Sequence, residues 1–128
     1  MTCYVDDPIH KFGRMLMCHL WADTEEELLR MVDTIGVQRK WIQGHPTLSH
    51  GKHRDASWVH FDVSKAKRLL AIKAGARPTD MFGPLEHTAK LLLAKGKIEG
   101  NQELIDHAQN KLLEIVNCRA RRNAGKLL

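Results

Sequence analysis

Residues 15–36, MLMCHLWADTEEELLRMVDTIG, decide the fold because a β-type pattern passes directly into an α-type pattern. The first part, Met15 to Trp21, predicts a strand, although a short helix would also fit. As a strand, it would place four alternate side chains on one face: Met15, Met17, His19 and Trp21. A histidine and a tryptophan would therefore share one face of a sheet.

The second part of this stretch predicts a helix. Thr24 and Glu27 can form a capping box, and the acids at positions 25–27 complement the positive end of the helix dipole. Four apolar residues supply a buried stripe: Leu28, Leu29, Val32 and Ile35. Gly36 suits the left-handed conformation that ends many helices. We therefore expect this helix to end at Gly36.

Further strands and a second helix are expected on both sides of this stretch. Thr2 to Val5 is a β-prone run that ends at Asp6-Asp7-Pro8, where proline removes a backbone donor. Val37 to Ile42 and Ser57 to Phe61 also predict strands. Ser64 can cap a helix that runs to Ala74. This order predicts an α/β or α+β domain over residues 1–77, with helices packed on a small mixed sheet.

The pattern after residue 77 is helical only. Pro84 suits the first position of a helix over Leu85 to Lys95, and Asn101 can cap another helix. Two glycines are expected to break the chain between them: Gly96 and Gly100. Residues 78–128 therefore predict a helical hairpin. Its apolar stripe must be covered by the sheet domain or by a second subunit, so a homodimer through these helices is one expectation.

The charge balance of the chain favours anionic partners. Among 128 residues, 20 Lys and Arg stand against 15 Asp and Glu, which gives a formal net charge of +5. Such an excess favours nucleotides, nucleic acid or phosphate esters as ligands. It is equally common as ordinary solubility chemistry. The charge therefore indicates a class of partner without identifying one.

Cysteine spacing and apolar runs limit the cellular setting. The three cysteines are widely separated and form no C-x-x-C pair: Cys3, Cys18 and Cys118. This pattern suggests neither a disulfide framework nor a zinc knuckle, and it fits a reducing compartment. No export signal opens the sequence, and no apolar run approaches the roughly 20 residues that cross a bilayer. We therefore expect a cytoplasmic protein without a membrane partner.

Histidines are concentrated in the first part of the chain. Six of the eight lie before Gly75: His10, His19, His45, His50, His53 and His60. Imidazole is the commonest transition-metal ligand and titrates near neutrality, so this clustering favours metal binding or proton transfer. No H-E-x-x-H motif is present, and the spacing alone specifies no coordination geometry. The stretch 44–53, which holds three of these histidines, could be a mobile loop over a site.

Carboxylates offer a second route to a metal site. On the strand predicted to end near Phe61, His60 and Asp62 would share one face. Asp6 or Asp7, after the first strand, could meet Asp62 at one sheet edge and bind magnesium or manganese. The alternative is that Asp6 only ends a strand and that Asp62 caps the following helix.

Basic and aromatic residues could complete a site for an anionic ligand. Six basic residues surround these positions in the sequence: Arg14, Arg39, Lys52, Arg54, Lys65 and Arg68. They could clamp an anionic substrate, or each could be solvated surface. Trp41, next to Arg39 and Lys40, is typical of single-stranded nucleic-acid binding, whereas core packing is the ordinary role of tryptophan.

Several motifs together resemble a known family. They are Tyr4-Val-Asp-Asp, Cys18-His-Leu-Trp-Ala-Asp-Thr24 followed by Glu27-Leu28, Gly36 and Arg39, then Trp58-Val-His-Phe-Asp-Val63 and Gly75-Ala76. Over about residues 2–77 the chain resembles domain of unknown function family 4031, which is found in phage and bacterial genomes. The resemblance implies six characteristic polar positions: Asp6, His19, Asp23, Arg39, His60 and Asp62. It also implies that a loop carrying His45, His50 and His53 lies outside the shared site, because shorter members lack much of it. A phage accessory protein in the bacterial cytoplasm is the implied setting.

These observations support two main hypotheses of function. The first is a metal-assisted hydrolase of phosphodiester or nucleotide substrates, with Mg, Mn or Zn as cofactor. Its catalytic residues would be His19, His60 and Asp62, and its metal ligands Asp6, His19, His60 and Asp62. Its substrate-binding residues would be Arg14, Arg39, Lys65, Arg68 and Trp41. The second is a non-enzymatic nucleotide- or nucleic-acid-binding accessory protein, and a structural protein that dimerises through its C-terminal helices is a third possibility.

Overall fold

The computed structural model of the chain describes residues 2–8 and 10–127. The chain divides into two compact units, Met1–Met81 and Phe82–Leu128. The sequence had placed this boundary between residues 77 and 78. The α+β class, with a mixed sheet and a C-terminal helical hairpin, is confirmed.

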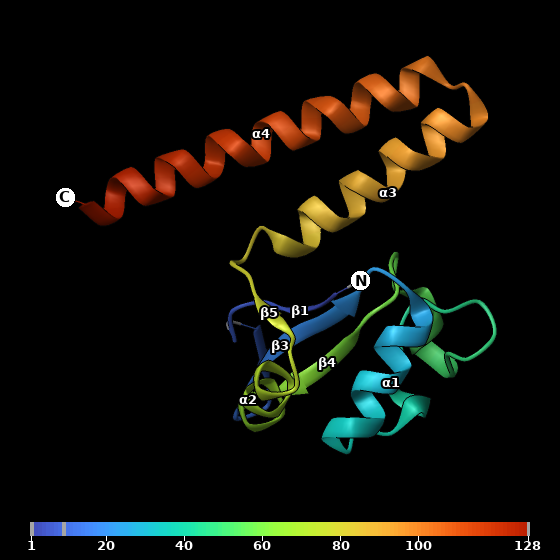
Figure 1. The fold of residues 1–128 in the computed structure, drawn as a ribbon, viewed down its shortest axis with the longest axis vertical. Coiled ribbons are helices and arrows are strands. Elements are labelled where there is room, and N and C mark those ends of the chain that lie inside the picture. Colours follow the sequence, from blue (N-terminus) through green and yellow to red (C-terminus); the bar gives the residue numbers. More distant parts are fainter. Residues whose placement is uncertain (1, 9, 128) are drawn as a thin grey trace. The chain divides into compact units, whose positions relative to one another are not determined.

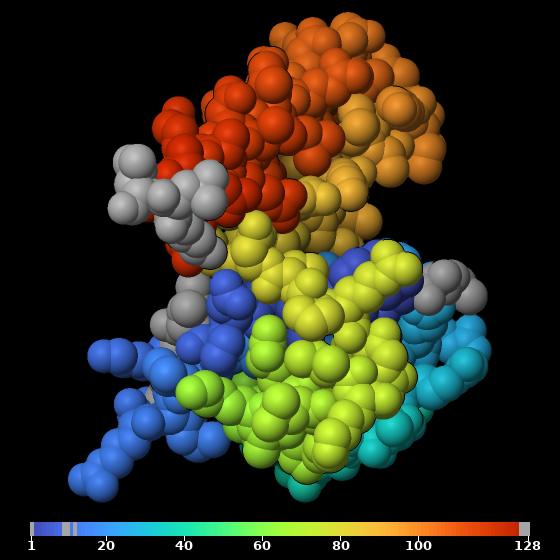
Figure 2. Space-filling model, turned by 60° about the vertical axis from the view of Figure 1, so that its left-hand side comes forward, coloured from blue at the N-terminus to red at the C-terminus, as the bar shows by residue number. Residues whose placement is uncertain are grey.

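The sheet of the first unit is built around one long strand. β3 (Met15–Ala22) pairs antiparallel with β1 (Cys3–Val5), β2 (His10–Phe12) and β4 (Phe61–Ser64), as Figure 1 shows in part. β5 (Arg77–Pro78) joins β1 in parallel, which makes the sheet mixed. Blue side chains from the early part of the chain extend outward from the surface of this unit (Figure 2). Because β3 has neighbours on both sides, its side chains are well placed to meet residues that are distant in sequence.

Two helices cover one face of this sheet. α1 (Glu25–Ile35) and α2 (Lys65–Lys73) pack there on a core in which Leu20 and Phe61 are fully buried. Each such side chain contributes roughly 1.5–3 kcal/mol by leaving water. The helix ends follow local signals, because the Thr24 and Ser64 hydroxyls each accept a backbone N–H in the first turn. Gly36 ends α1 with φ 78°, so both predicted caps and this terminator are confirmed.

The segment between α1 and β4 differs from its prediction. Residues 37–42 were expected to form a strand, but η1 (Arg39–Trp41) is a short 3₁₀ turn. The N–H groups of Trp41 and Ile42 bond to carbonyls three residues earlier, so they are not offered to a strand partner. The strand expected at residues 57–61 begins later, at Phe61. Pairing explains this shift, because Phe61 to Ser64 pair with β3, whereas His60 forms an isolated bridge with Gln43.

The second unit is the predicted helical hairpin. α3 (Gly83–Glu99) and α4 (Gln102–Leu127) are joined by Gly100, at φ 66°, and by Asn101, whose side chain accepts the Leu104 N–H. Gly96 was expected to break the chain, which is wrong. It lies inside α3, where an added Cβ would approach Ile105 to 3.0 Å, so its role is close helix packing. No helix within the described residues has the length and apolar character needed to span a membrane.

An ion pair between the two helices makes the stability of this unit depend on pH. The hydrogen bond from Lys90 lowers the pKa of Glu86, burial opposes this effect, and Arg119 of α4 lowers the pKa further. A carboxyl with a lowered pKa stabilises the fold above its unfolded pKa of about 4.3, and this contribution is lost as pH falls through the folded value.

Glu86→Gln should therefore destabilise the hairpin at neutral pH but not in acid. We expect a loss of less than about 1 kcal/mol at pH 7, because the pair is partly exposed. The measurement is urea unfolding followed by circular dichroism at pH 7 and at pH 3. Glu99→Gln, at an exposed position of the same helix, is the control. An equal loss at both pH values would contradict the assignment.

Candidate metal centre

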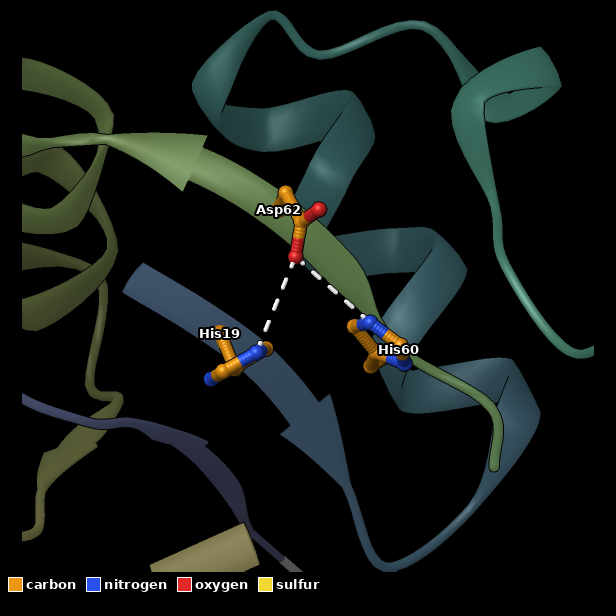
Figure 3. A group of neighbouring side chains, drawn as sticks. All are labelled: His19, His60 and Asp62. Carbon is orange, nitrogen blue, oxygen red and sulfur yellow. Dashed lines mark ion pairs between the residues drawn. The ribbon is translucent and has the colours of Figure 1, made fainter. Parts of the chain in front are cut away.

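The register of β3 and β4 brings three potential metal ligands together. His19 lies directly opposite Asp62, and opposed residues of an antiparallel pair share a face. His60 is two residues before Asp62 and therefore points the same way. Figure 3 shows the three side chains converging from these two segments. The neighbouring residues Cys18 and Phe61 point into the core instead, so the cluster lies on the face opposite α1 and α2.

The distances within this cluster are close to those of a metal-bound set. Asp62 Oδ1 lies 3.5 Å from His60 Nε2 and 3.9 Å from His19 Nε2. The three ligand atoms all lie within 4.8 Å of one another. Metal–ligand bonds of 2.0–2.2 Å at tetrahedral angles put ligands about 3.4 Å apart. A small inward movement of His19 would therefore complete such a set.

Both histidines have the ring nitrogen that faces away from the cluster held by an acceptor. His19 Nδ1 lies 2.6 Å from Asp6 Oδ2, and Asp6 Oδ1 also accepts the backbone N–H of His19 at 2.6 Å. His60 Nδ1 lies 3.0 Å from the carbonyl oxygen of Trp58. A carbonyl and a carboxylate only accept, so each neutral ring carries its proton on Nδ1 and presents the lone pair of Nε2 to Asp62.

Asp62 is held in the same manner. Gln43 donates from Nε2 to Asp62 Oδ2 at 2.7 Å, which turns Oδ1 toward the histidines. Oδ1 is shielded from solvent. Gln43 is itself fixed by a backbone bridge to His60, with N–H···O distances of 2.9 and 3.1 Å. Each of the three potential ligands thus has a separate positioning partner, the arrangement usual around metal-binding residues.

The loop that carries Gln43 approaches the site closely because of a glycine. Gly44 has φ 75°, and an added Cβ would lie 2.1 Å from the carbonyl oxygen of Trp58. That carbonyl positions His60, and the Trp58 ring stacks on the His60 ring at 4.1 Å. Only glycine leaves room for this approach. Gly44 therefore lets the loop backbone lie against the carbonyl that orients His60.

The electrostatics of His19 follow from these partners. Burial alone lowers the pKa of His19, but the hydrogen bond to Asp6 and the charges of Asp6 and Asp62 outweigh it and raise the pKa above its ordinary value. The site therefore favours positive charge on or next to His19. A divalent cation held at Nε2 would supply that charge.

The comparison with protein families identifies a family but no activity. Residues 3–90 match the profile of a family described as Protein of unknown function (DUF4031). The chain belongs to the DUF4031 family. The match confirms the resemblance seen in the sequence and extends it from residue 77 into α3. The chain has no significant match among curated proteins or among solved structures.

Two other polar positions implied by the DUF4031 resemblance have structural partners elsewhere. Asp23 accepts hydrogen bonds from the Thr2 N–H at 3.0 Å and from the Tyr4 hydroxyl at 3.1 Å. Arg39 forms a two-pronged pair with Asp33, at 3.0 and 2.6 Å. The six positions therefore divide into a site group of Asp6, His19, His60 and Asp62, and two surface anchors.

Asp6 was predicted as a direct metal ligand, and the structure gives it a different position. Asp6 is 2% exposed, and its two oxygens contact the backbone and ring of His19 from behind. Arg68, predicted to hold substrate, donates instead to the Asp6 carbonyl at 2.8 Å. Asp6 thus holds the backbone and ring of His19, and Arg68 ties α2 to Asp6.

A hollow of about 690 Å³ opens beside Asp62. Of the five residues predicted to bind substrate, Trp41 lines it, whereas Arg14, Arg39, Lys65 and Arg68 do not. Lys11, Lys52 and His53 also line it. Lys52 was one of the basic residues noted in the sequence. Lys11 and Gln43 were missed, since neither belongs to a motif and only the fold brings them to Asp62.

The histidine-rich loop divides between structural and site roles. His45 is buried, and its Nδ1 accepts the backbone N–H groups of Thr47 and Leu48 while Nε2 pairs with Glu25 at 2.9 Å. His45 therefore holds the loop in shape. His50 is exposed, and His53 faces the hollow. Of the four histidines in residues 44–62, His60 alone belongs to the potential ligand set among the described residues.

Cys18, next to His19 in sequence, is not a nucleophile. Burial, reinforced by the charge of Asp6, raises the pKa of Cys18 to about 12. Its thiol also points into the core, opposite to His19. A thiolate at neutral pH is therefore absent at this position.

Proposed function

We propose that this protein binds a divalent transition-metal ion through His19, His60 and Asp62 and uses it to hydrolyse phosphate esters of nucleotides or nucleic acid. One observation carries the proposal. Three ligand atoms converge while the other polar atom of each ligand is held by a separate group. Metal-ligating histidines and carboxylates usually have such hydrogen-bonding partners.

Among magnesium, manganese and zinc, the set of ligand atoms favours zinc. Magnesium prefers an octahedron of oxygens and keeps several waters. Two imidazoles and one carboxylate suit zinc, which binds nitrogen and oxygen at 2.0–2.2 Å. Catalytic zinc sites use three protein ligands and leave a position for water or substrate.

Different residues of this chain would have different roles in hydrolysis. A zinc ion in such a site supplies a water nucleophile at neutral pH and polarises a phosphoryl oxygen. Asp6 keeps the His19 proton on Nδ1, and the Trp58 carbonyl does the same for His60. Lys11 and Lys52 bring positive charge to the adjacent hollow and would attract an anionic ester.

The direct test is hydrolysis by protein freed of metal with a chelator and then supplied with Zn²⁺, Mn²⁺ or Mg²⁺. We expect cleavage of bis(p-nitrophenyl) phosphate or of a short oligonucleotide with Zn²⁺, and its loss when chelator is added again. Asp62→Asn should abolish the activity, while Asp55→Asn, at an exposed position of the same unit, should retain it. Metal binding without cleavage of any phosphoester would refute the hydrolase.

A second candidate function is binding of a nucleotide or nucleic acid without turnover. It is supported by the hollow, where Trp41 and two lysines lie together. Ligand binding that is weakened by salt, unaffected by chelator and followed by no product would favour this candidate.

A further inference from the structure

The hollow beside Asp62 combines an aromatic ring with two cationic side chains. Trp41 comes from η1, Lys11 from β2, and Lys52 from η2 (Gly51–Asp55). Three segments that are distant in sequence thus supply one surface. Its volume of about 690 Å³ lies within the range of small-molecule sites.

Trp41 is held in place but remains open to a ligand. Trp41 is 49% exposed, in contrast to Trp21, which is 2% exposed. The ammonium of Lys40 lies over one face of the indole, 4.9 Å from its centre, and the His53 ring lies nearly perpendicular to the indole at 6.1 Å. The indole is therefore oriented by its neighbours, and a flat base would stack on the face that Lys40 does not cover.

The two lysines supply a complementary feature. Among the described residues, neither Lys11 nor Lys52 has a carboxylate within ion-pair distance, although both line the hollow. Ammonium groups without an internal partner suit a phosphate, which they bind as point charges. Met17 also lines the hollow and adds apolar surface.

We propose that this hollow binds one unpaired nucleotide, with the base stacked on Trp41 and the phosphate held by Lys11 and Lys52 next to Asp62. The inference rests on the proposed function for the hydrolysis of the bound nucleotide. The binding of the nucleotide itself does not depend on that function. An unpaired base can offer a π-face to the indole, whereas a base inside a duplex is covered on both faces. The site is therefore one for a mononucleotide or for a nucleotide within a single strand.

The first experiment separates the two halves of the ligand. The full chain, kept metal-free with chelator, is titrated by calorimetry with AMP, adenosine and ribose 5-phosphate. We expect AMP to bind at least about tenfold more tightly than either fragment, because each fragment fills one half of the site. Equal binding of AMP and one fragment would overturn the proposal.

Variants then assign each half to its residues. Trp41→Ala should weaken AMP at least about tenfold and leave ribose 5-phosphate unchanged, since stacking is lost alone. Lys52→Ala should weaken AMP and ribose 5-phosphate but not adenosine. Lys73→Ala removes the same charge from an exposed position outside the hollow and should change nothing. AMP affinity that is indifferent to Trp41→Ala would refute the stacking site.

A third measurement distinguishes the source of the nucleotide and separates this inference from the metal site. A single-stranded oligonucleotide should bind with the same dependence on Trp41, and the matching duplex at least about tenfold more weakly. Tight duplex binding would contradict the proposal. Because AMP binding is measured under chelator and needs no metal, failure of the metal site would not be mistaken for failure of the nucleotide site.

Discussion

Replacement of His60 by alanine should weaken zinc binding by more than about 100-fold. Loss of a residue that only positions a ligand typically costs 10–100-fold in metal affinity, and loss of a ligand itself should cost more. His60 supplies one of three converging atoms, and its Nε2 lies 3.5 Å from Asp62 Oδ1. The measurement is a zinc titration in competition with a chromogenic chelator.

The same variant should remove the stabilisation of the fold by zinc. At a free zinc concentration 100 times the Kd, the wild-type protein should gain about 2.7 kcal/mol in free energy of unfolding. His60→Ala should gain almost nothing under the same conditions. Tryptophan fluorescence during urea unfolding reports this directly, because Trp21, Trp41 and Trp58 all belong to the first unit.

Two further variants test whether weaker zinc binding comes from loss of a ligand or from disturbed packing. His50→Ala removes an exposed imidazole from the neighbouring loop and should keep the affinity of the wild-type protein for zinc. His60 is 5% exposed and stacks on Trp58, so its removal also disturbs packing. Asp62→Asn preserves the shape of the third ligand and should lose zinc as well. Wild-type affinity in a folded Asp62→Asn protein would show that these residues are not ligands.

The parts of the fold that depend on neighbouring residues could be predicted from the sequence. The ends of α1 and α2 follow from Thr24, Gly36 and Ser64, whose effects act on backbone groups within one turn. The family resemblance was also visible in short ordered motifs and is confirmed over residues 3–90. Such signals need no knowledge of tertiary structure.

The errors arose where tertiary contacts decide the outcome. Residues 37–42 alternate like a strand, yet Ile42 is buried in the core by a 3₁₀ turn rather than by a strand. Gly96 resembles a chain break, yet it permits contact with Ile105 of the neighbouring helix. In both cases the sequence pattern is compatible with two structures, and tertiary packing determines which one forms.

The candidate site was predicted in part for the same reasons. The sequence named His19 with His60 and Asp62 and placed the last two on one face, and the structure adds that His19 lies directly opposite Asp62. The sequence could not give the register that creates this pair. It could not distinguish Asp6 as a ligand from Asp6 as a positioning residue either, because that distinction depends on which His19 atom the carboxylate reaches.

Asp6→Asn should lower zinc affinity by about 10–100-fold while the fold is retained. The carboxylate accepts both the backbone N–H of His19 and the proton on Nδ1. Asparagine can still accept the backbone N–H through its single oxygen, but its NH₂ group would then face Nδ1. Since an NH₂ group donates, the His19 ring would carry its proton on Nε2, where zinc must bind. A zinc titration measures the affinity, and ¹⁵N shifts of the imidazole report the tautomer.

Asp7→Asn is the matched control, since it removes a carboxylate from the next position, where the side chain is only half-buried. It should change neither the zinc affinity nor the tautomer of His19. If Asp6→Asn also bound zinc as tightly as the wild-type protein, Asp6 would be no more than the residue that ends β1. If affinity fell while the tautomer stayed the same, the loss would come from charge alone, because the negative charge of Asp6 also favours a cation at His19. The two readouts together therefore separate control of the proton from simple attraction.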